Sequence, residues 1–384
     1  MNSKRKTVLI FSEWYHPGYK AGGPITSLTN LVNLIGDSIT VKIVCGDRDY
    51  LETKPYDGIL LSQWCNVGKA EVYYLPRALR KFSKIKELLT KINPDVIYVN
   101  AMFSRVFTIY PILAAKGGDA KIVLAPRGML APSALQIKKR KKLLFLKLAK
   151  RFDVFASVSF HATNRVEADQ VNKTFFRNKV VVLENVPTFR EHEFQVNTPL
   201  KRSNMLNLYM VARVAPEKNI HFALHCLREI EGNNRVTLKV IGPIYDQSYF
   251  EGCKKIIARL KPNVTVEFLG PKTQNEILSI ANQSDFFYLP TAGENYGHAI
   301  VEALLSNVPV IISNLTPWRN LQHHNLGFDL PLDPEKFTEA INNCASLSNN
   351  QYSKLYENIG VTAQSLININ NLHKGYLKLF NGRD

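Results

Sequence analysis

The sequence of 384 residues contains no long apolar run. No uninterrupted apolar segment approaches the roughly 18 residues that a membrane-spanning helix needs, so we expect any contact with a membrane to be peripheral. The apolar run nearest the N-terminus, Val8 to Phe11, is too short for the core of a signal peptide. It predicts a first buried strand instead.

Cysteine is also scarce. The five cysteines are odd in number, are scattered along the chain and form no C-x2-C pair. This distribution favours neither a disulfide framework nor a cysteine-based zinc site, and we expect the chain to work in a reducing cytoplasm. The cysteines are Cys45, Cys65, Cys226, Cys253 and Cys344.

Acidic residues are few relative to basic ones. The chain has 32 Asp and Glu against 49 Lys and Arg, which gives a formal net charge of +17. Such an excess predicts an anionic partner: nucleic acid, an acidic lipid surface or a phosphorylated substrate. No aromatic-rich platform or recognised nucleic-acid motif accompanies the charge, which argues against nucleic acid.

The positive charge is densest between residues 136 and 152. We expect a helix that packs on its domain through an apolar face and presents a cationic outer face to anionic lipid headgroups, at about 1 kcal/mol per charge. A solvated charged helix without a partner is the alternative. The apolar face consists of Ile137, Leu144, Leu148 and Phe152, and the cationic face of Lys139, Lys142, Lys147 and Lys150.

Strand-like and helix-like segments alternate along the chain, whose length suits two domains. Such alternation predicts doubly wound parallel sheets, since parallel neighbours need crossover helices. We expect a first domain over residues 1–186, a polar linker over 187–204, a second domain over 205–363 and a final helix, 364–384, that returns to the first domain. The first-domain strands are expected at 7–11, 41–45, 72–75, 96–99, 122–124, 154–160 and 180–183.

The most informative stretch is Pro290 to Glu302. It follows an apolar strand-like run and leads into a helix-like run, so the backbone N–H groups of the glycine-containing loop and the helix start suit a phosphate. A carboxylate close to a diphosphate would repel it, so Glu294 and Glu302 are expected to face hydroxyl groups. A ligand with both a diphosphate and many hydroxyls is a nucleotide sugar.

A pair of cationic residues follows another predicted strand. Arg213 and Lys218 lie at the start of a predicted helix, where cations oppose the helix dipole at a cost of a few tenths of a kcal/mol each. An anion bound between them explains the pair better than helix stability does.

These residues resemble those of a known family. Gly-Glu-Asn-Tyr-Gly-His-Ala-Ile-Val-Glu-Ala-Leu, with Glu294 and Glu302, is similar to the E-x7-E signature of retaining glycosyltransferases of family four, and Arg213 with Lys218 to the Arg-x4-Lys pair of that family. The resemblance implies the GT-B fold, in which two Rossmann-like domains face a cleft. It also implies metal-independent, cofactor-free transfer of a sugar, most simply UDP-linked, to an acceptor hydroxyl with retention.

The resemblance also assigns roles in the second domain. Arg213 and Lys218 would hold the donor diphosphate, Glu294 would orient the donor sugar, and Glu302 would bind the ribose. The loops that contain Gly242 and Pro271 would line the base pocket. Further donor contacts are expected at Asn295, Tyr296, Gly297 and His298.

In the first domain, Gly22 and Gly23 form a glycine-rich turn after the first strand, expected to contact a ligand. Arg127 begins Arg-Gly-Met-Leu, which looks like the acceptor-side loop of family members that build bacterial surface polysaccharides. His161 and Glu167 resemble the His-Ala-Thr-Asn-x-x-Glu element near the cleft. His161 sits at the carboxyl end of a predicted strand and is a candidate helper in deprotonating the acceptor.

The resulting prediction is a bacterial transferase on the inner face of the cell membrane, with a carbohydrate or lipid-linked saccharide as acceptor and capsule or O-antigen as product. Two alternatives remain: a nucleotide-sugar epimerase of the same fold, and a basic nucleic-acid-binding protein. Interconversion of sugars with the nucleotide retained would indicate the epimerase.

Overall fold

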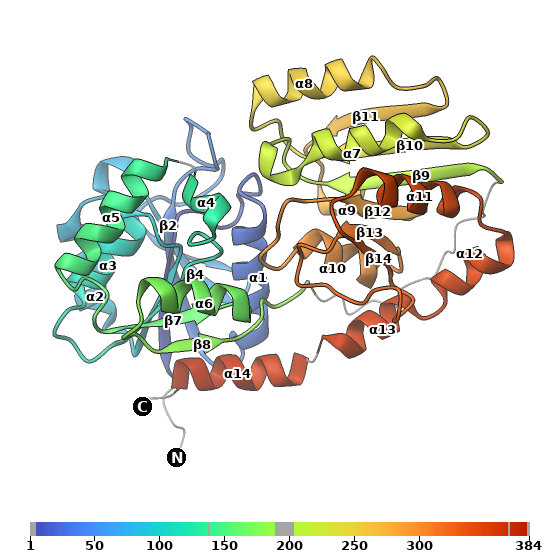
Figure 1. The fold of residues 1–384 in the computed structure, drawn as a ribbon. Coiled ribbons are helices and arrows are strands. Elements are labelled where there is room, and N and C mark those ends of the chain that lie inside the picture. The colour runs from blue at the N-terminus through green and yellow to red at the C-terminus, as the bar shows by residue number, and fades with distance from the viewer. Residues whose placement is uncertain (1–4, 137, 189–202, 368, 382–384) are drawn as a thin grey trace. The chain divides into compact units, whose positions relative to one another are not determined.

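The computed structural model describes residues 5–136, 138–188, 203–367 and 369–381. These residues form two compact units, one of 5–188 with 369–381 and the other of 203–367 (Figure 1). Most of the predicted linker, residues 187–204, lies outside the described residues. No helix among the described residues is long and apolar enough to cross a bilayer.

The first unit is built on an eight-stranded sheet in the order β3-β4-β2-β1-β5-β6-β7-β8. Every neighbouring pair is parallel except β3 with β4, which is an antiparallel hairpin that the apolar pattern did not predict. Ile10 of β1 pairs with Ile43 of β2 and with Tyr98 of β5, so β1 is central. The strands are β1 (Thr7–Ser12), β2 (Thr40–Gly46), β3 (Trp64–Val67), β4 (Ala70–Leu75), β5 (Val96–Asn100), β6 (Lys121–Ala125), β7 (Val158–Ala162) and β8 (Val180–Val182).

Side chains alternate between two cores, one on each face of this sheet. Leu9 and Phe11 belong to one core, and Val8 and Ile10 belong to the other, because successive strand residues point to opposite faces. The first core is covered by α2 (Phe82–Ile92), α3 (Tyr110–Ala114), α5 (Lys139–Arg151) and α6 (Arg165–Thr174), and the second by α1 (Gly23–Ile35) and α14 (Ile369–Asn381).

The C-terminal helix belongs to the first unit, and Figure 1 shows it, in red, beside the blue and green elements of that unit. Tyr376, Leu379 and Phe380 of α14 are buried in the second core with residues of α1. The Tyr376 hydroxyl donates a hydrogen bond of 2.9 Å to the carbonyl of Glu184. The predicted return of the last helix to the first domain is therefore confirmed.

The second unit is built on a six-stranded sheet in the order β11-β10-β9-β12-β13-β14, and all its pairs are parallel. Within the unit, α7 packs against α8 and α11, and α10 packs against α13. The structure therefore has the predicted fold class, two doubly wound α/β units. The elements are β9 (Met205–Val211), α7 (Ile220–Cys226), β10 (Arg235–Ile241), α8 (Gln247–Ile257), β11 (Val264–Gly270), α9 (Gln274–Ala281), β12 (Phe286–Leu289), α10 (His298–Leu305), β13 (Val310–Ser313), β14 (Gly327–Leu330), α11 (Pro334–Ala345), α12 (Asn349–Tyr356) and α13 (Ile359–Leu366).

The orientation predicted for the basic helix is wrong. Leu146 and Ala149 face the core, whereas Leu144, Leu148 and Phe152 are 57%, 46% and 66% exposed. Lys142, expected on the cationic outer face, is only partly exposed and donates a hydrogen bond of 2.7 Å to the carbonyl of Ala134 (α4, Pro132–Gln136). Ile137, the remaining member of the predicted apolar face, lies outside the described residues.

Candidate functional site

Two loops of the second unit leave the same edge of the sheet. The loop of residues 212–219 follows β9, and the loop of residues 290–297 follows β12. Because β9 and β12 are parallel neighbours, with Phe287 opposite Tyr209, their carboxyl ends lie side by side. This edge is where open α/β sheets bind ligands.

Two hydrogen bonds tie these loops together, and a third joins the second loop to β13. The Asn219 amide donates to the carbonyl of Pro290 at 3.0 Å, and the Thr291 hydroxyl donates to the carbonyl of Glu217 at 3.2 Å. The Ser313 hydroxyl donates to the carbonyl of Thr291 at 2.6 Å. Asn219 and Thr291 were not predicted as site residues, and the sequence signal for them is weak because their role is to hold backbone. Their contacts fix the positions of the side chains between them.

Lys218 and Glu294 form an ion pair between the loops. The Lys218 ammonium lies 2.5 Å from Glu294 Oε1, and the two side chains are only 18% and 13% exposed. An ion pair shielded from water is held more rigidly than one on the surface, since fewer water molecules compete for its hydrogen bonds. The structure thus brings together one residue from each predicted motif.

Arg213 is held differently from Lys218. Its guanidinium lies 3.1 Å from Glu217 Oε1 and 4.9 Å from the centre of the Tyr245 ring. The side chain is about one-third exposed. Arg213 therefore follows the same strand as Lys218, but it contacts Glu217 on its own loop and Tyr245 on the loop after β10.

Glycine opens the helix that carries the second glutamate. Gly297 has a φ of +79° and caps α10 without any side-chain hydrogen bond, and the first turn of α10 has no acidic residue. A Cβ at Gly297 would lie 2.8 Å from the side chain of Ile300. An uncapped helix N-terminus offers backbone N–H groups and a partial positive charge to an anion.

Tyr296, two residues before the helix, is positioned by Trp318. Trp318 Nε1 donates a hydrogen bond of 2.7 Å to the carbonyl of Tyr296, and the two rings pack edge to face. Tyr296 is buried and its ring also lies 4.8 Å from that of His298, whereas Asn295 is partly exposed. Trp318 was not predicted, because nothing in the sequence marks a tryptophan twenty residues downstream as part of this loop.

Glu302 lies one turn into α10, beside a small pocket. The pocket also includes Tyr209 of β9 and Gln274 of α9. Burial raises the pKa of the Tyr209 hydroxyl well above its usual value, and the nearby Glu302 charge raises it further. Glu302 thus lines this pocket together with residues of β9 and α9.

The predicted base-pocket loops meet through their backbones. Gly242 donates its N–H to the carbonyl of Gly270, directly before Pro271, at 2.9 Å. At Gly242, with a φ of +147°, a Cβ would lie only 2.1 Å from the carbonyl oxygen of Ala212. Glycine is therefore required there by the close approach of two loops, while Pro271 is exposed.

In the first unit, Gly22 and Gly23 start α1 at the carboxyl end of β1. Gly22 has a φ of +66° and caps the helix, Gly23 begins it, and no side chain caps it. The preceding residues Tyr19 and Lys20 donate their N–H groups to Asp49 at 2.8 and 3.0 Å. The turn is therefore held against the loop that follows β2.

Arg127 and Glu167 both stabilise the loop after β6. Arg127, with a φ of +56°, donates to Asn100 Oδ1 at 2.7 Å, to the Tyr98 hydroxyl at 3.0 Å and to Asn185 Oδ1. Glu167 is buried and accepts the Gly128 N–H at 2.6 Å. Its other oxygen accepts the N–H and hydroxyl of Thr163 at 2.7 Å each. Both residues position this loop, and Arg127 remains partly exposed.

His161 is fully buried, and this geometry does not fit the predicted role of proton acceptor. Its Nε2 lies 2.8 Å from the carbonyl of Leu183, so Nε2 carries the proton, and Nδ1 accepts from the Tyr98 hydroxyl at 2.8 Å. Burial, with the Arg127 charge, lowers the pKa of His161 to about 3. A neutral imidazole with both nitrogens engaged is a core residue that positions Tyr98.

A model of the family described as glycosyl transferases group 1 matches residues 191–364 of the chain. Over 310 residues, the chain is 24% identical to the capsular polysaccharide biosynthesis glycosyltransferase CapM of Staphylococcus aureus. That alignment covers 74% of this chain and 79% of CapM.

Solved structures resemble nearly the whole chain. Alr3699/HepE of Anabaena, in complex with UDP-glucose, has a TM-score of 0.69 at 16% identity, with 98% of this chain and 99% of that chain covered. WaaG, a glycosyltransferase involved in lipopolysaccharide biosynthesis, has a TM-score of 0.65 at 13% identity, with 98% and 100% covered. At such identities the likeness shows the fold alone, and it confirms the predicted GT-B fold.

Proposed function

We propose that this chain is a retaining glycosyltransferase of group 1, the family whose model matches residues 191–364, and that it transfers a sugar from a UDP-sugar to an acceptor hydroxyl. The observation that carries the proposal is the shielded pair of Lys218 and Glu294 on the sheet edge that also bears the uncapped start of α10. Alr3699/HepE, whose fold this chain shares, was solved with UDP and glucose, which supports uracil as the base.

The diphosphate of the donor is proposed to bind at Lys218, Arg213 and the first N–H groups of α10. During transfer, the bond from the sugar to the diphosphate breaks and negative charge grows on the leaving oxygen. Cations and fixed N–H groups stabilise that charge without further reorganisation, because they are already in place. The contacts of Asn219 and Thr291 supply this preorganisation.

The two glutamates are proposed to bind the hydroxyl groups of the donor. Glu294, with Oε1 on Lys218, has a second carboxylate oxygen with which to accept hydrogen bonds from the sugar, so it fixes the sugar relative to the diphosphate. Glu302, beside the pocket with Tyr209 and Gln274, would bind the ribose. The leaving phosphate oxygen is proposed to take the proton of the acceptor hydroxyl on the same face, since His161 is not placed to do so.

The acceptor is proposed to be a lipid-linked or growing surface polysaccharide that binds the first unit. CapM and WaaG, which this chain resembles, take part in capsule and lipopolysaccharide biosynthesis. In the first unit, the Gly22–Gly23 turn and the loop of Arg127 lie at the carboxyl ends of β1 and β6, on one edge of the sheet.

We also propose that α5 binds an anionic membrane on the cytoplasmic side. Leu144, Leu148 and Phe152 are spaced four residues apart and are exposed, so they form one apolar stripe. Arg140, Lys147 and Arg151 lie along one side of this stripe, and Lys141 lies within it, one turn before Leu144. An exposed apolar stripe flanked by cations suits an interface between acyl chains and anionic headgroups.

The function is tested by incubating the protein with a panel of UDP-sugars and measuring UDP release and the configuration of any glycoside formed. We expect UDP release that rises with an acceptor and a product with the donor's anomeric configuration. Interconversion of UDP-sugars without UDP release would instead indicate an epimerase and would refute the proposal.

A further inference from the structure

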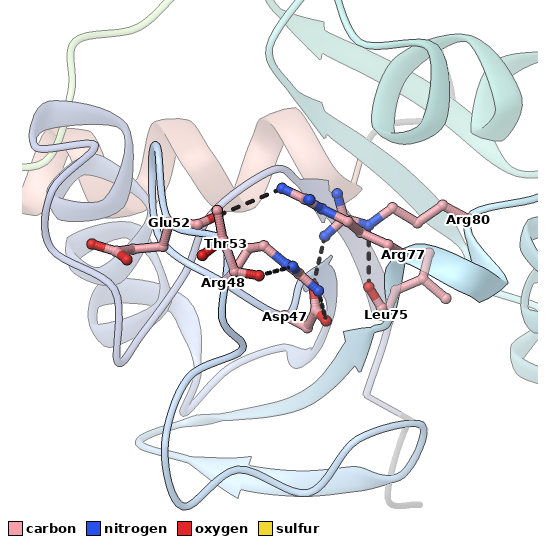
Figure 2. A network of polar contacts seen from close by, with 7 residues as sticks. All are labelled: Asp47, Arg48, Glu52, Thr53, Leu75, Arg77 and Arg80. Atoms are coloured by element: carbon pink, nitrogen blue, oxygen red, sulfur yellow. Dashed lines mark hydrogen bonds and ion pairs between the residues drawn. The ribbon is translucent and has the colours of Figure 1, made fainter.

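A cluster of arginines lies at the carboxyl edge of the first sheet. Asp47 and Arg48 directly follow β2, and Arg77 and Arg80 follow the neighbouring strand β4 (Figure 2). The three guanidinium groups therefore come from two adjacent strand ends, on the edge that also carries the Gly22–Gly23 turn.

Two of the arginines share one buried carboxylate. Arg48 binds Asp47 in a bidentate manner, with Nε 3.0 Å from Oδ1 and Nη2 2.8 Å from Oδ2. Arg80 Nη2 lies 2.8 Å from the same Oδ1, while Asp47 itself is almost completely buried. The adjacent arginines hold the pKa of the Asp47 carboxyl below its usual value in spite of its burial.

The backbone is shaped to let Arg80 reach this position. A Cβ at Gly46 would lie 2.9 Å from Arg80 Nη2, so a larger residue there would displace the guanidinium. Arg80 Nε donates to the carbonyl of Leu75 at 3.3 Å, and the guanidinium lies 5.5 Å from the centre of the Phe107 ring. Arg80 is thus fixed on three sides while it stays partly exposed.

Arg77 has much less to hold it. It is exposed, and the one hydrogen bond that its guanidinium donates among the described residues goes to the carbonyl oxygen of Glu52, at a long 3.5 Å. The Glu52 carboxylate points away from the guanidinium groups in Figure 2 and pairs with Lys20. Within the part of the chain that the structure describes, Arg77 forms no ion pair.

The cluster carries more positive than negative charge. Three guanidinium groups against the Asp47 carboxylate leave two positive charges, and Lys20 with Glu52 adds none. The Asp49 carboxylate accepts the N–H groups of Tyr19, Lys20 and Tyr50 and, counted with the cluster, reduces the excess to one positive charge. Burial and the charges of Arg48 and Arg77 lower the pKa of Arg80. Such repulsion is relieved when a further anion binds.

We propose that Arg77 and Arg80 bind a phosphate or diphosphate group of the acceptor. This inference rests on the proposed function, because it assigns a substrate group to the acceptor-binding unit. A guanidinium fork matches phosphate oxygens, and two neighbouring guanidinium groups can share the several charged oxygens of one phosphate, whereas a carboxylate has only two oxygens. The acceptor class is therefore a phosphorylated or diphosphate-linked saccharide, and its phosphate lies at the ends of β2 and β4.

The test is calorimetric titration of inorganic pyrophosphate into the full chain saturated with UDP, which keeps pyrophosphate out of the donor site. We expect saturable binding that Arg77→Ala weakens about tenfold, the loss of one charge-assisted contact. Arg77→Ala is preferred to Arg80→Ala because Arg80 is a partner of buried Asp47 and Arg77 is not. Lys91→Ala, which removes one exposed charge from α2, is the matched control and should bind as wild type does.

Several outcomes distinguish the possible sources of the phosphate. Tighter binding of geranyl diphosphate than of pyrophosphate would assign a lipid diphosphate, and tighter binding of glucose 6-phosphate would assign a sugar phosphate. Equal binding by wild type and Arg77→Ala, or no binding of any phosphate, would overturn the inference, as would equal binding of glucuronate.

The proposed function is tested by a separate measurement on the same samples. UDP should bind to Arg77→Ala with wild-type affinity, because the variant leaves the second unit unchanged. Failure of UDP to bind wild type would count against the proposed function. In that case, Arg77-dependent binding of pyrophosphate in a Lys218→Ala background would still support an anion site in the first unit.

Discussion

Removal of the Lys218 ammonium should cost both stability and turnover. Loss of one partner from a fully buried ion pair costs about 3 to 5 kcal/mol, whereas an exposed pair contributes about 0 to 1 kcal/mol. Lys218 and Glu294 are 18% and 13% exposed, which places this pair between the two cases. We therefore expect Lys218→Ala to lower the free energy of unfolding by about 2 kcal/mol.

The effect of Lys218→Ala on catalysis should be larger. Loss of a single preorganised group that stabilises developing negative charge reduces kcat by about 100-fold to 1,000-fold in other enzymes. We expect at least about a hundredfold slower UDP release from the preferred UDP-sugar, and the same for Glu294→Ala. The rate is measured at a temperature well below the unfolding midpoint of the variant, so that lost stability does not count as lost activity.

A double-mutant cycle separates the pair from the rest of the site. Lys218→Ala and Glu294→Ala should together destabilise the protein by less than the sum of the single changes, with a coupling of about 1 to 2 kcal/mol. The matched control is Lys254→Ala, whose pair with Glu251 at 2.8 Å is about half exposed, and which should change stability by less than about 0.5 kcal/mol. Near wild-type turnover in Lys218→Ala would refute the site assignment.

Three further predictions concern other parts of the chain. Because the pKa of His161 falls from 6.5 to about 3 on folding, the unfolded state binds more protons between these pH values. Stability conferred by neutral His161 should then drop by about 2 kcal/mol from pH 7 to pH 5, and chemical denaturation should show a flatter pH profile for His161→Asn. Leu144→Ser with Leu148→Ser should weaken co-sedimentation with anionic vesicles about thirtyfold, since each half-exposed side chain contributes about 1 kcal/mol on insertion. Gly242→Ala should destabilise the protein by about 3 kcal/mol in thermal unfolding and raise the KM for the donor, because its Cβ would clash with the carbonyl of Ala212.

Each of these predictions has its own control and its own contrary result. Equal pH profiles for wild type and His161→Asn would mean that folding does not change the pKa of His161. Unchanged sedimentation of the variant with Leu144→Ser and Leu148→Ser would mean that α5 is a solvated helix without a membrane partner. Sedimentation with neutral vesicles is the control, and it shows how much of the binding depends on charge. Gly232→Ala, where an added Cβ meets no atom within 4 Å, is the matched control for Gly242→Ala and should be nearly neutral.

The alternation of strands and helices predicted the two parallel sheets, because apolar runs separated by amphipathic segments have few other stable arrangements. The placement of Lys218 against Glu294 could also be anticipated, since both follow strands of one sheet and strand ends converge at one edge. The hairpin of β3 and β4 was missed because its partly exposed strand lacks a continuous apolar run.

Side-chain environments were harder to predict than strands. His161 has the same sequence context whether it lines a site or lies in the core, and only the packing of Tyr98 and Leu183 around it decides. The orientation of α5 was predicted wrongly for a similar reason. Its leucines and phenylalanine are spread around the helix, so periodicity allows two apolar faces. The face with Leu146 packs because it meets Phe155 and neighbouring core residues.

The central claim is that the second unit holds the diphosphate of a nucleotide sugar, and titration of UDP into the full chain by calorimetry tests it most directly. We predict saturable binding of one UDP per chain, weakened at least about tenfold by Arg213→Ala and by Lys218→Ala, and unchanged by Lys254→Ala. Absence of UDP binding, or equal affinity in all four proteins, would contradict the claim.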